Sequence, residues 1–371
     1  MKPSLYIGVM SGTSLDGVDI ALVDIQSTNV SLIASECYPI PQSLKSNLLT
    51  LCTNQQSSLQ QLGEIDHQLG ELYATVINEF ILKNQIDKNN ICAIGCHGQT
   101  LYHSPCGAYP FTMQIGDANI ISAKTNITTI ADFRRKDMAL GGQGAPLVPA
   151  FHQAILARPN TTRVILNIGG ISNITVLAPN QSVIGYDTGP GNVLLDSWMM
   201  YNLNQAYDKD ANFAKTGDIN TALLHDLLNE VYFSKPYPKS TGRELFNFNW
   251  LQQKLAKHNI TAQDVQATLV ELTVIATVNQ LTHLALPKTL PCELLVCGGG
   301  AKNPLMMERF SQHLPDWLVT TTDAFGINSD YMEAMAFAWL AYCRIHHINS
   351  NIPSVTGAKK AVCLGVIYPN N

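Results

Sequence analysis

The chain has little charge, and what it has is not concentrated. Only 14% of its 371 residues are charged, the formal net charge is −5, and no block of Lys and Arg stands out. A nucleic acid is therefore not an expected partner, because polyanions are held by clustered cations. Hydrophobic residues make up 46% of the chain, which is enough for a large core and argues against disorder.

Signals for export and for membrane insertion are also lacking. The short apolar run after Lys2 meets Asp16 and Asp19 too soon for a signal peptide. The long apolar stretch 268–286 contains Glu271, so it predicts a buried helix rather than a membrane span. Nine cysteines form no small-domain disulfide framework, and reduced thiols fit best. We expect a soluble cytoplasmic protein that does not bind a membrane.

Two familiar kinds of site are missing as well. No Walker loop occurs, and no Gly-x-Gly-x-x-Gly follows a strand, so neither standard phosphate motif is present. Cys92 and Cys96 lie near His97 and His103 but fall within an apolar strand, whereas zinc ligands usually come from tight knuckles. We therefore predict no metal centre of this kind.

What the chain does contain is a turn of Gly, Ser and Thr between two strands. Residues 8–19 read GVMSGTSLDGVD, between the apolar runs 5–10 and 18–25. Glycines let a ligand approach the backbone, and the hydroxyl and N–H groups of such a turn can surround an anion, most naturally a phosphate. The candidate phosphate-binding residues here are Ser11, Gly12, Thr13, Ser14 and Gly17.

Glycine turns recur later in the chain. Gly169 and Gly170 follow the apolar strand 163–168 and precede another strand. Either turn alone could be an ordinary hairpin, but two in matching positions favour a nucleotide gripped from two sides. Gly298, Gly299 and Gly300 lie between a strand and a helix, where they predict a binding role. The alternative is a plain strand-to-helix turn with Asn303 as N-cap, and both can hold together.

Polar side chains at strand ends predict the chemistry. Asp187, in the Gly- and Pro-rich turn 185–192, is a candidate general base, although a loop Asp more often closes an Asx turn. His97, Gln99 and Thr100 suit the hydroxyls of a sugar. The remaining candidates are Arg134 and Arg135, which could clamp a carboxylate or form a surface turn, and Glu333, which together with Asp330 reads as a capping box.

The order of elements predicts two similar α/β domains. Three strands followed by alternating helices and strands occur twice in a chain long enough for about two domains. We expect the first domain at 1–140 and the second at 141–357, with a hinge in the Gly/Pro segment 141–146. The tail 358–371 is expected to pack on the first domain.

Six segments resemble those of the anhydro-N-acetylmuramic acid kinase family, which belongs to the actin-like, sugar-kinase and heat-shock-chaperone ATPase superfamily. They are 8–19, 97–100, 132–135, 167–173, 187–192 and 297–304. The resemblance implies two ribonuclease-H-like domains with an interdomain ATP cleft. It also implies an enzyme that uses ATP and water to open 1,6-anhydro-N-acetylmuramic acid and phosphorylate O6, giving N-acetylmuramic acid 6-phosphate in cell-wall recycling.

The resemblance also implies roles for residues. Asp187 would deprotonate the water, residues 12–19 with Gly169 and Gly170 would hold phosphates, and Gly298 to Gly300 would hold the adenosine. The further residues implied are Asp16, Asp19, Asn167 and Asn303 for the nucleotide, and Gly189 and Glu333 for the sugar. Mg²⁺ is implied, but Met10 stands where many superfamily kinases carry an Asp ligand, which leaves Asp16, Asp19 and Asp187 as candidates through water.

Two rival functions remain at this stage. An actin-like or chaperone ATPase would share the fold and the nucleotide site but not the sugar-binding residues. A glycoside hydrolase using Asp187 and Glu333 as a carboxylate pair would leave the three glycine turns unexplained. We expect a small amino sugar as the partner and a homodimer as the assembly.

Overall fold

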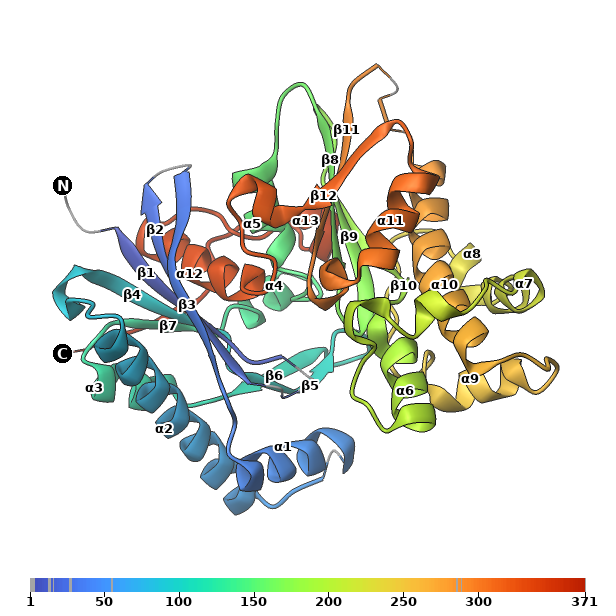
Figure 1. The fold of residues 1–371 in the computed structure, drawn as a ribbon. Helices are drawn as coiled ribbons and strands as arrows, with labels where there is room; N and C mark the ends of the chain where they lie inside the picture. Colours follow the sequence, from blue (N-terminus) through green and yellow to red (C-terminus); the bar gives the residue numbers. More distant parts are fainter. Residues whose placement is uncertain are drawn as a thin grey trace. The chain divides into compact units, whose positions relative to one another are not determined.

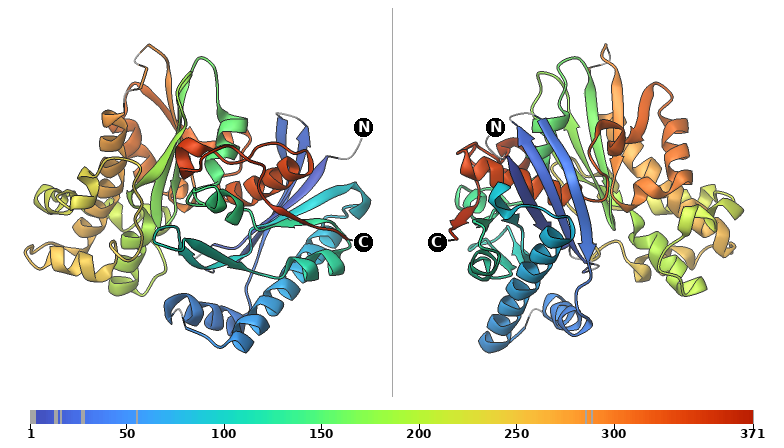
Figure 2. Two further views of the ribbon diagram at one scale, coloured as in Figure 1. Left: turned by 180° about the vertical axis from the view of Figure 1, so that it is seen from behind. Right: turned by 60° about the vertical axis from the view of Figure 1, so that its left-hand side comes forward.

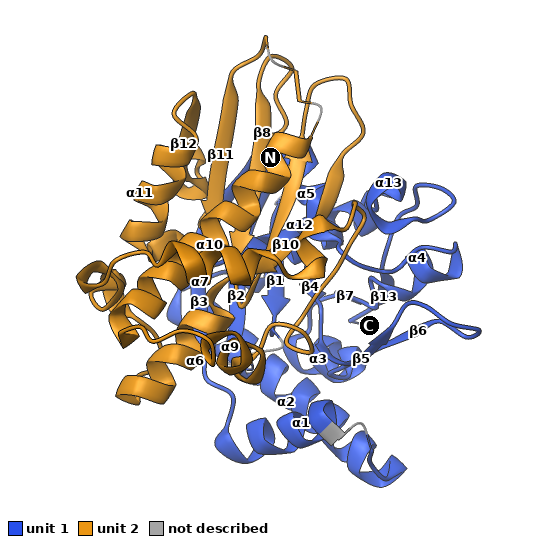
Figure 3. Cartoon of the chain, turned by 90° about the vertical axis from the view of Figure 1, so that its right-hand side faces the viewer, with its two compact units in different colours: residues 1–155, 331–371 blue, residues 156–330 orange. Residues whose placement is uncertain are grey.

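The computed structural model describes residues 4–12, 15, 17–26, 29–54, 56–284, 286, 287 and 289–370. It divides into two compact units, of which unit 1 contains residues 1–155 and 331–371 and unit 2 contains residues 156–330 (Figure 3). The predicted pair of similar α/β domains is confirmed by the strand order inside each unit.

Unit 1 is built on a six-stranded sheet of order β13-β7-β4-β1-β2-β3 (Figure 1). Its strands are β1 (Leu5–Met10), β2 (Val18–Gln26), β3 (Asn29–Tyr38), β4 (Ile91–Cys96), β7 (Thr129–Ala131) and β13 (Val366–Tyr368). The first three form an antiparallel meander, which Figure 2 shows in blue, and β4 runs parallel to β1. A separate hairpin consists of β5 (Gln99–Ser104) and β6 (Phe111–Ile115).

Helices cover both faces of this sheet. The helices of unit 1 are α1 (Gln42–Asn54), α2 (Leu59–Lys83), α3 (Ala118–Thr125), α4 (Arg135–Ala139), α5 (Val148–Leu156), α12 (Met332–Ile345) and α13 (Pro353–Thr356). Side chains of α2 join those of β1 and β2, such as Ile7 and Val9, in one hydrophobic core. Since strand side chains alternate, Gly8 lies on the other face. A Cβ atom there would lie 1.7 Å from the carbonyl oxygen of Ala334, so the glycine lets α12 dock against the sheet.

Unit 2 repeats the plan with a five-stranded sheet of order β10-β9-β8-β11-β12. Its strands are β8 (Thr162–Ile168), β9 (Ile171–Leu177), β10 (Ile184–Pro190), β11 (Cys292–Cys297) and β12 (Trp317–Thr321). Its helices are α6 (Asn192–Leu203), α7 (Thr221–Leu228), α8 (Val231–Ser234), α9 (Phe248–Leu255), α10 (Ala262–His283) and α11 (Pro304–His313). Strands β8, β9 and β10 form the second antiparallel meander, and β11 runs parallel to β8, as β4 does to β1.

The unit boundaries differ from the expected ones. The segment 141–146, expected to be a hinge, lies within unit 1, where Gly144 contacts the buried carboxylate of Asp137. This carboxylate accepts hydrogen bonds from Gly144 N (2.8 Å), Asn351 Nδ2 (2.6 Å) and Thr356 Oγ1 (2.8 Å). The segment 331–357, expected in the second domain, belongs to unit 1 because α12 packs on β1, β2 and β4.

The remaining expectations concern the long apolar stretch and the cysteines. The apolar stretch predicted as a buried helix is α10, most of whose side chains are buried. None of the helices that the structure describes has the length and hydropathy needed to cross a membrane. All nine cysteines are free thiols.

Candidate functional site

Three polar residues form a row across the meander of unit 2. Asn167 on β8 is opposite Asn173 on β9, which in turn is opposite Asp187 on β10. Residues paired in this way share one face of a sheet. Asp187 therefore lies close to the Gly169–Gly170 turn that joins β8 to β9. It lies within β10, just before an irregularity in the strand register, and not in a turn beyond the strand end as the sequence predicted.

The surroundings of Asp187 suit a general base. The pKa of Asp187 is raised to about 6, mainly because the carboxylate is buried; the hydrogen bond from the Thr241 backbone N–H lowers it, and the nearby Glu244 carboxylate adds to the rise. That N–H donates to Oδ2 of Asp187 at 3.0 Å, while Tyr232 Oη donates to its backbone oxygen at 2.6 Å. A carboxylate with this pKa is mostly ionised at pH 7 and can still accept a proton effectively.

The Gly169–Gly170 turn is held in place through its carbonyl groups. Gly169 O accepts from Asn192 N at 2.8 Å, and Gly170 O accepts from Gly191 N and Val193 N at 2.9 and 3.1 Å. The oxygens are therefore directed toward the start of α6. A Cβ atom on either glycine would find no atom of the described residues closer than 3.7 Å. The nearest atoms to these added Cβ positions, Ile171 O and Val193 Cβ, lie at 3.7 and 3.8 Å, so the turn leaves room for an anion to approach its backbone.

Two of the three glycines after β11 are required by the local structure itself. Gly298 has φ 77°, which favours glycine, and a Cβ on Gly300 would lie 2.3 Å from Ile168 Cγ2. Gly299 is the exposed member of the triplet, and neither its φ angle nor the space around it requires a glycine. Asn303 is the N-cap of α11, since its side chain accepts from Met306 N at 3.0 Å. The N-cap interpretation therefore holds, and a nucleotide role rests mainly on Gly299.

Unit 1 brings together three of the predicted sugar-binding residues. Arg134 donates from Nε to His97 Nε2 at 3.0 Å and from Nη1 to Gly144 O at 2.8 Å. Among the described residues, its Nη2 has no hydrogen-bond partner. Burial holds the pKa of His97 well below its usual range, and Arg134 lowers it further. His97 is thus neutral, and because its Nε2 accepts from Arg134, its proton is on Nδ1.

Glu333 completes this cluster from α12. It lies one turn before Phe337, whose ring packs against that of His97 with centroids 4.7 Å apart. Desolvation raises the pKa of Glu333, Asp19 adds to this, and Arg134 opposes it. The predicted capping box is wrong, because α12 begins at Met332 after Tyr331, with no side-chain cap. Glu333 is available to a ligand because the helix does not use its carboxylate.

Other predicted residues are turned away from this cluster. The Ser11 hydroxyl is buried and contacts Tyr73 Oη at 2.7 Å and Gln99 Oε1 at 2.9 Å. Thr100 Oγ1 accepts from Gln114 at 3.1 Å. Three predicted phosphate-binding residues, Thr13, Ser14 and Asp16, lie outside the described residues. Gly12, Gly17 and Asp19 are described, and Gly12 O accepts from Leu15 N at 3.1 Å.

For Arg135 and Gly189, the local structure accounts for the residue without a ligand. Arg135 is exposed and paired with Asp132 at 2.6 Å, so it forms the surface turn that was the alternative interpretation. Gly189 has φ 148°, and a Cβ there would lie 2.7 Å from Phe233 Cε1. Its conformation and packing therefore explain the glycine without a ligand.

The sequence profile described as anhydro-N-acetylmuramic acid kinase matches residues 4–370. The chain belongs to this family. A relative of that name from Pasteurella multocida (strain Pm70) is 59% identical over 365 residues, covering 98% of this chain and 96% of the relative. Another, from Vibrio vulnificus (strain YJ016), is 56% identical over 365 residues, covering 98% of each chain. Membership in this kinase family favours the kinase hypothesis over an actin-like ATPase or a glycoside hydrolase.

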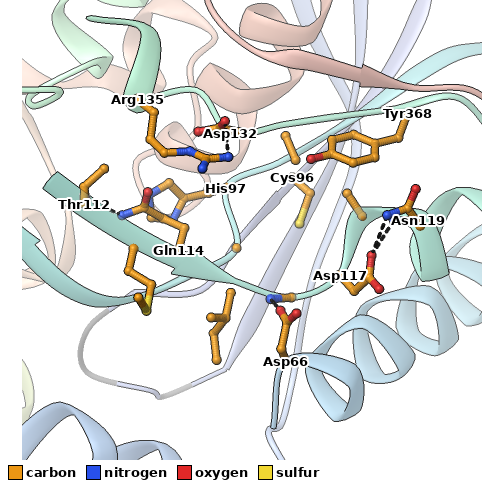
Figure 4. Close-up of a pocket in the computed structure, with 16 residues that line it drawn as sticks. Asp66, Cys96, His97, Thr112, Gln114, Asp117, Asn119, Asp132, Arg135 and Tyr368 are labelled. Carbon is orange, nitrogen blue, oxygen red and sulfur yellow. Dashed lines mark hydrogen bonds and ion pairs between the residues drawn. The ribbon is translucent and has the colours of Figure 1, made fainter. Parts of the chain in front are cut away.

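A polar cavity of about 290 Å³ in unit 1 is not where the kinase's predicted sugar-binding residues meet (Figure 4). His97 and Arg135 line it, but Arg134 and Glu333 do not. Its carboxylates are already engaged: Asp66 accepts from Gly116 N, Asp117 from Asn119 N, and Asp132 pairs with Arg135. The cavity therefore offers few unsatisfied charges to a ligand.

Sequence reasoning missed one segment of the kinase site. Residues 235–247 connect α8 to α9 and place Thr241, Arg243 and Glu244 near Asp187 and the Gly169–Gly170 turn. The available signal was the run KPYPKSTGRE at 235–244, which is rich in Pro and basic residues. Nothing in that run states which strand it contacts.

No metal-binding cluster of three or more His, Cys, Asp or Glu is found in the part of the chain that the structure describes. Mg²⁺ in kinases is held largely by phosphate oxygens and water, with one or two carboxylates. Asp187 fits that limited role, because only its Oδ2 has a hydrogen bond to a described residue.

Proposed function

We propose that this chain phosphorylates O6 of 1,6-anhydro-N-acetylmuramic acid with ATP while water opens the anhydro ring. The product would be N-acetylmuramic acid 6-phosphate. The observation that carries the proposal is Asp187, a buried carboxylate with its pKa raised to about 6, in register with Asn167 beside an open glycine turn. Family membership supplies the substrate class.

The proposed step conserves atoms and charge. Asp187 takes a proton from water, and the resulting oxygen attacks C1 of the sugar. The C1–O6 bond breaks, its electron pair stays on O6, and O6 attacks the γ-phosphorus of ATP as ADP leaves. Glycine-turn backbone groups would hold the phosphates, since in-line positioning and charge stabilisation dominate such transfers. When bound, Mg²⁺ would neutralise phosphate charge, with Asp19 or Asp187 acting through water.

Unit 1 would recognise the sugar. We propose that Arg134 donates from Nη2 to the lactyl carboxylate, because its other nitrogens already hold His97 and Gly144. Glu333 would accept a hydrogen bond from the sugar. The neutral His97 fixes the guanidinium orientation without adding a competing charge.

The direct test is incubation with ATP, Mg²⁺ and the anhydro sugar in ¹⁸O-labelled water, followed by mass analysis of the product. We expect one phosphate and one ¹⁸O atom, with the label on the sugar at C1 and none on the phosphate. Label on inorganic phosphate, formed with or without sugar, would instead indicate a simple ATPase.

We further propose that the protein is cytoplasmic, since the reaction needs ATP and all nine cysteines are free thiols. As its assembly we propose a homodimer. Cell fractionation and light scattering of the purified protein test these two points separately. Recovery in the membrane fraction, or a monomer mass at working concentration, would contradict them.

A further inference from the structure

A cation stands beside the Gly169–Gly170 turn and belongs to none of the predicted residues. The Nη2 atom of Arg243 lies 3.9 Å from the point that a Cβ atom on Gly170 would occupy. Arg243 is exposed, and its guanidinium makes no hydrogen bond or ion pair with any other residue that the structure describes. An arginine without an internal partner at an open glycine turn is suited to an external anion.

The backbone that carries Arg243 is fixed on both sides. Before it, Thr241 N donates to Asp187 and Lys239 O accepts from Asp187 N at 3.3 Å. After it, Phe246 is fully buried and packs against Tyr232 and Trp250 at centroid distances of 5.7 and 5.3 Å. The guanidinium is therefore presented from an anchored loop rather than from a free one.

Neighbouring charged groups are committed elsewhere. Lys239 Nζ donates to the backbone oxygens of Tyr232 and Phe233, both at 3.2 Å, at the end of α8. Glu244 interacts electrostatically with Asp187 and raises its pKa. The Thr241 hydroxyl is buried and has no hydrogen-bond partner among the described residues, so a polar group next to Asp187 remains unsatisfied. Lys235 lies over the Tyr232 ring, with Nζ 6.0 Å from the ring centroid. Arg243 is the cation of this loop whose charged group lies beside the Gly169–Gly170 turn.

We propose that Arg243 binds the phosphate chain of ATP at the Gly169–Gly170 turn and stabilises the phosphoryl group during transfer. This inference rests on the proposed function, because it assigns that turn to phosphate. An arginine suits the role, since its planar fork can donate two hydrogen bonds to one phosphate. The other anion in the reaction is the lactyl carboxylate of the sugar, which the test must separate from ATP.

The test compares Arg243→Ala and Arg243→Gln with the wild type by calorimetry, using a non-hydrolysable ATP analogue, adenosine and the anhydro sugar in separate titrations. We expect the affinity for the ATP analogue to fall at least about 10-fold, because a charge-assisted hydrogen bond is lost. Adenosine and sugar affinities should stay unchanged. Arg243→Lys should recover part of the loss, since it restores the charge but not the fork.

The matched control is Arg158→Ala, another exposed arginine of unit 2, which lies at the opposite end of β8 from the turn. It should leave all three affinities unchanged. Unchanged affinity for the ATP analogue in both Arg243→Ala and Arg243→Gln would overturn the proposal, as would a loss confined to the sugar, which would assign Arg243 to the carboxylate. If the wild type binds the analogue but leaves the sugar unphosphorylated, the proposed function fails while the phosphate contact stands.

Discussion

Asp187 has a backbone N–H on one carboxylate oxygen and a pKa of about 6, which suits proton removal from water. Replacing it with Asn keeps the shape and the hydrogen bond from Thr241 but removes the base. We expect Asp187→Asn to lose at least ~100-fold in turnover, a typical effect of losing a general base. ATP-analogue affinity measured by calorimetry should remain close to that of the wild type. Near-normal turnover in this variant would remove Asp187 from the mechanism.

The raised pKa of Asp187 also sets the pH dependence. The base must be ionised, so activity should be lost as pH falls through about 6 rather than through the usual aspartate range near 4. Below that point kcat/KM should drop about tenfold per pH unit. The measurement is a pH profile in buffers of constant ionic strength, with folding followed by circular dichroism. An acidic limb centred near pH 4 would show that burial does not raise the pKa of Asp187.

The two neighbouring arginines should behave differently. Arg134 is held by His97 and Gly144 and faces Glu333, whereas Arg135 is exposed and paired with Asp132. A lost charge-assisted contact is worth about 1.5–3 kcal/mol. We therefore expect Arg134→Ala to raise KM for the sugar at least ~10-fold with little change in KM for ATP. Arg135→Ala is the matched control and should leave both constants unchanged; equal effects of the two variants would contradict the assignment.

At the level of single residues, the sequence identifies chemistry better than orientation. His97, Arg134 and Asp187 were predicted as site residues, and the structure gives each of them an environment suited to that role. Ser11 and Gln99 carry suitable groups too, but both are buried: the Ser11 hydroxyl contacts Tyr73 Oη and donates to Gln99 Oε1. A sequence motif does not indicate which of its side chains point into the interior of the protein. Arg243 was missed because its partner turn lies more than seventy positions earlier in the chain.

At the level of elements, strongly apolar strands and long helices were predictable and short ones were not. The runs at 5–10, 91–96 and 293–297 are mostly apolar segments and lie in β1, β4 and β11. Strand β12 was missed because its five residues, WLVTT, show no alternation and stay partly exposed. The β5–β6 hairpin was missed because the Gly and Pro residues between its strands suggested a loop throughout.

The docking of α12 yields a stability prediction. A Cβ on Gly8 would lie 1.7 Å from Ala334 O, which is backbone and cannot move without shifting the helix. Gly8→Ala should therefore lower the free energy of unfolding by about 1–3 kcal/mol or more, as overpacked cores do. Gly63→Ala in α2 is the control, since nothing lies within 4 Å of its added Cβ, and it should stabilise by about 0.5–1 kcal/mol. Urea unfolding measures both, and equal midpoints would refute the packing argument.

At the scale of the whole molecule, the two units differ in how they are assembled from the chain. Unit 2 is one continuous segment, 156–330, whereas unit 1 needs residues from both ends of the sequence. We expect a fragment of residues 156–330 to unfold cooperatively on heating. A fragment of residues 1–155 should bind the dye ANS and show no cooperative transition, because α12 and β13 are missing from its sheet. A sharp melt for residues 1–155 alone would contradict this dependence.

Helix α12 packs on the sheet of unit 1 but comes late in the sequence, and this affects how the chain folds during synthesis on the ribosome. Domains usually fold in the order in which they emerge, with the N-terminal one first. Here the nascent chain delivers β1, β2 and β4 early, but the helix that covers one face of them is translated only after all of unit 2. The second-made unit can therefore fold first, while the first-made sheet keeps an apolar face uncovered. During that interval this face is the part of the nascent kinase that a chaperone would need to shield.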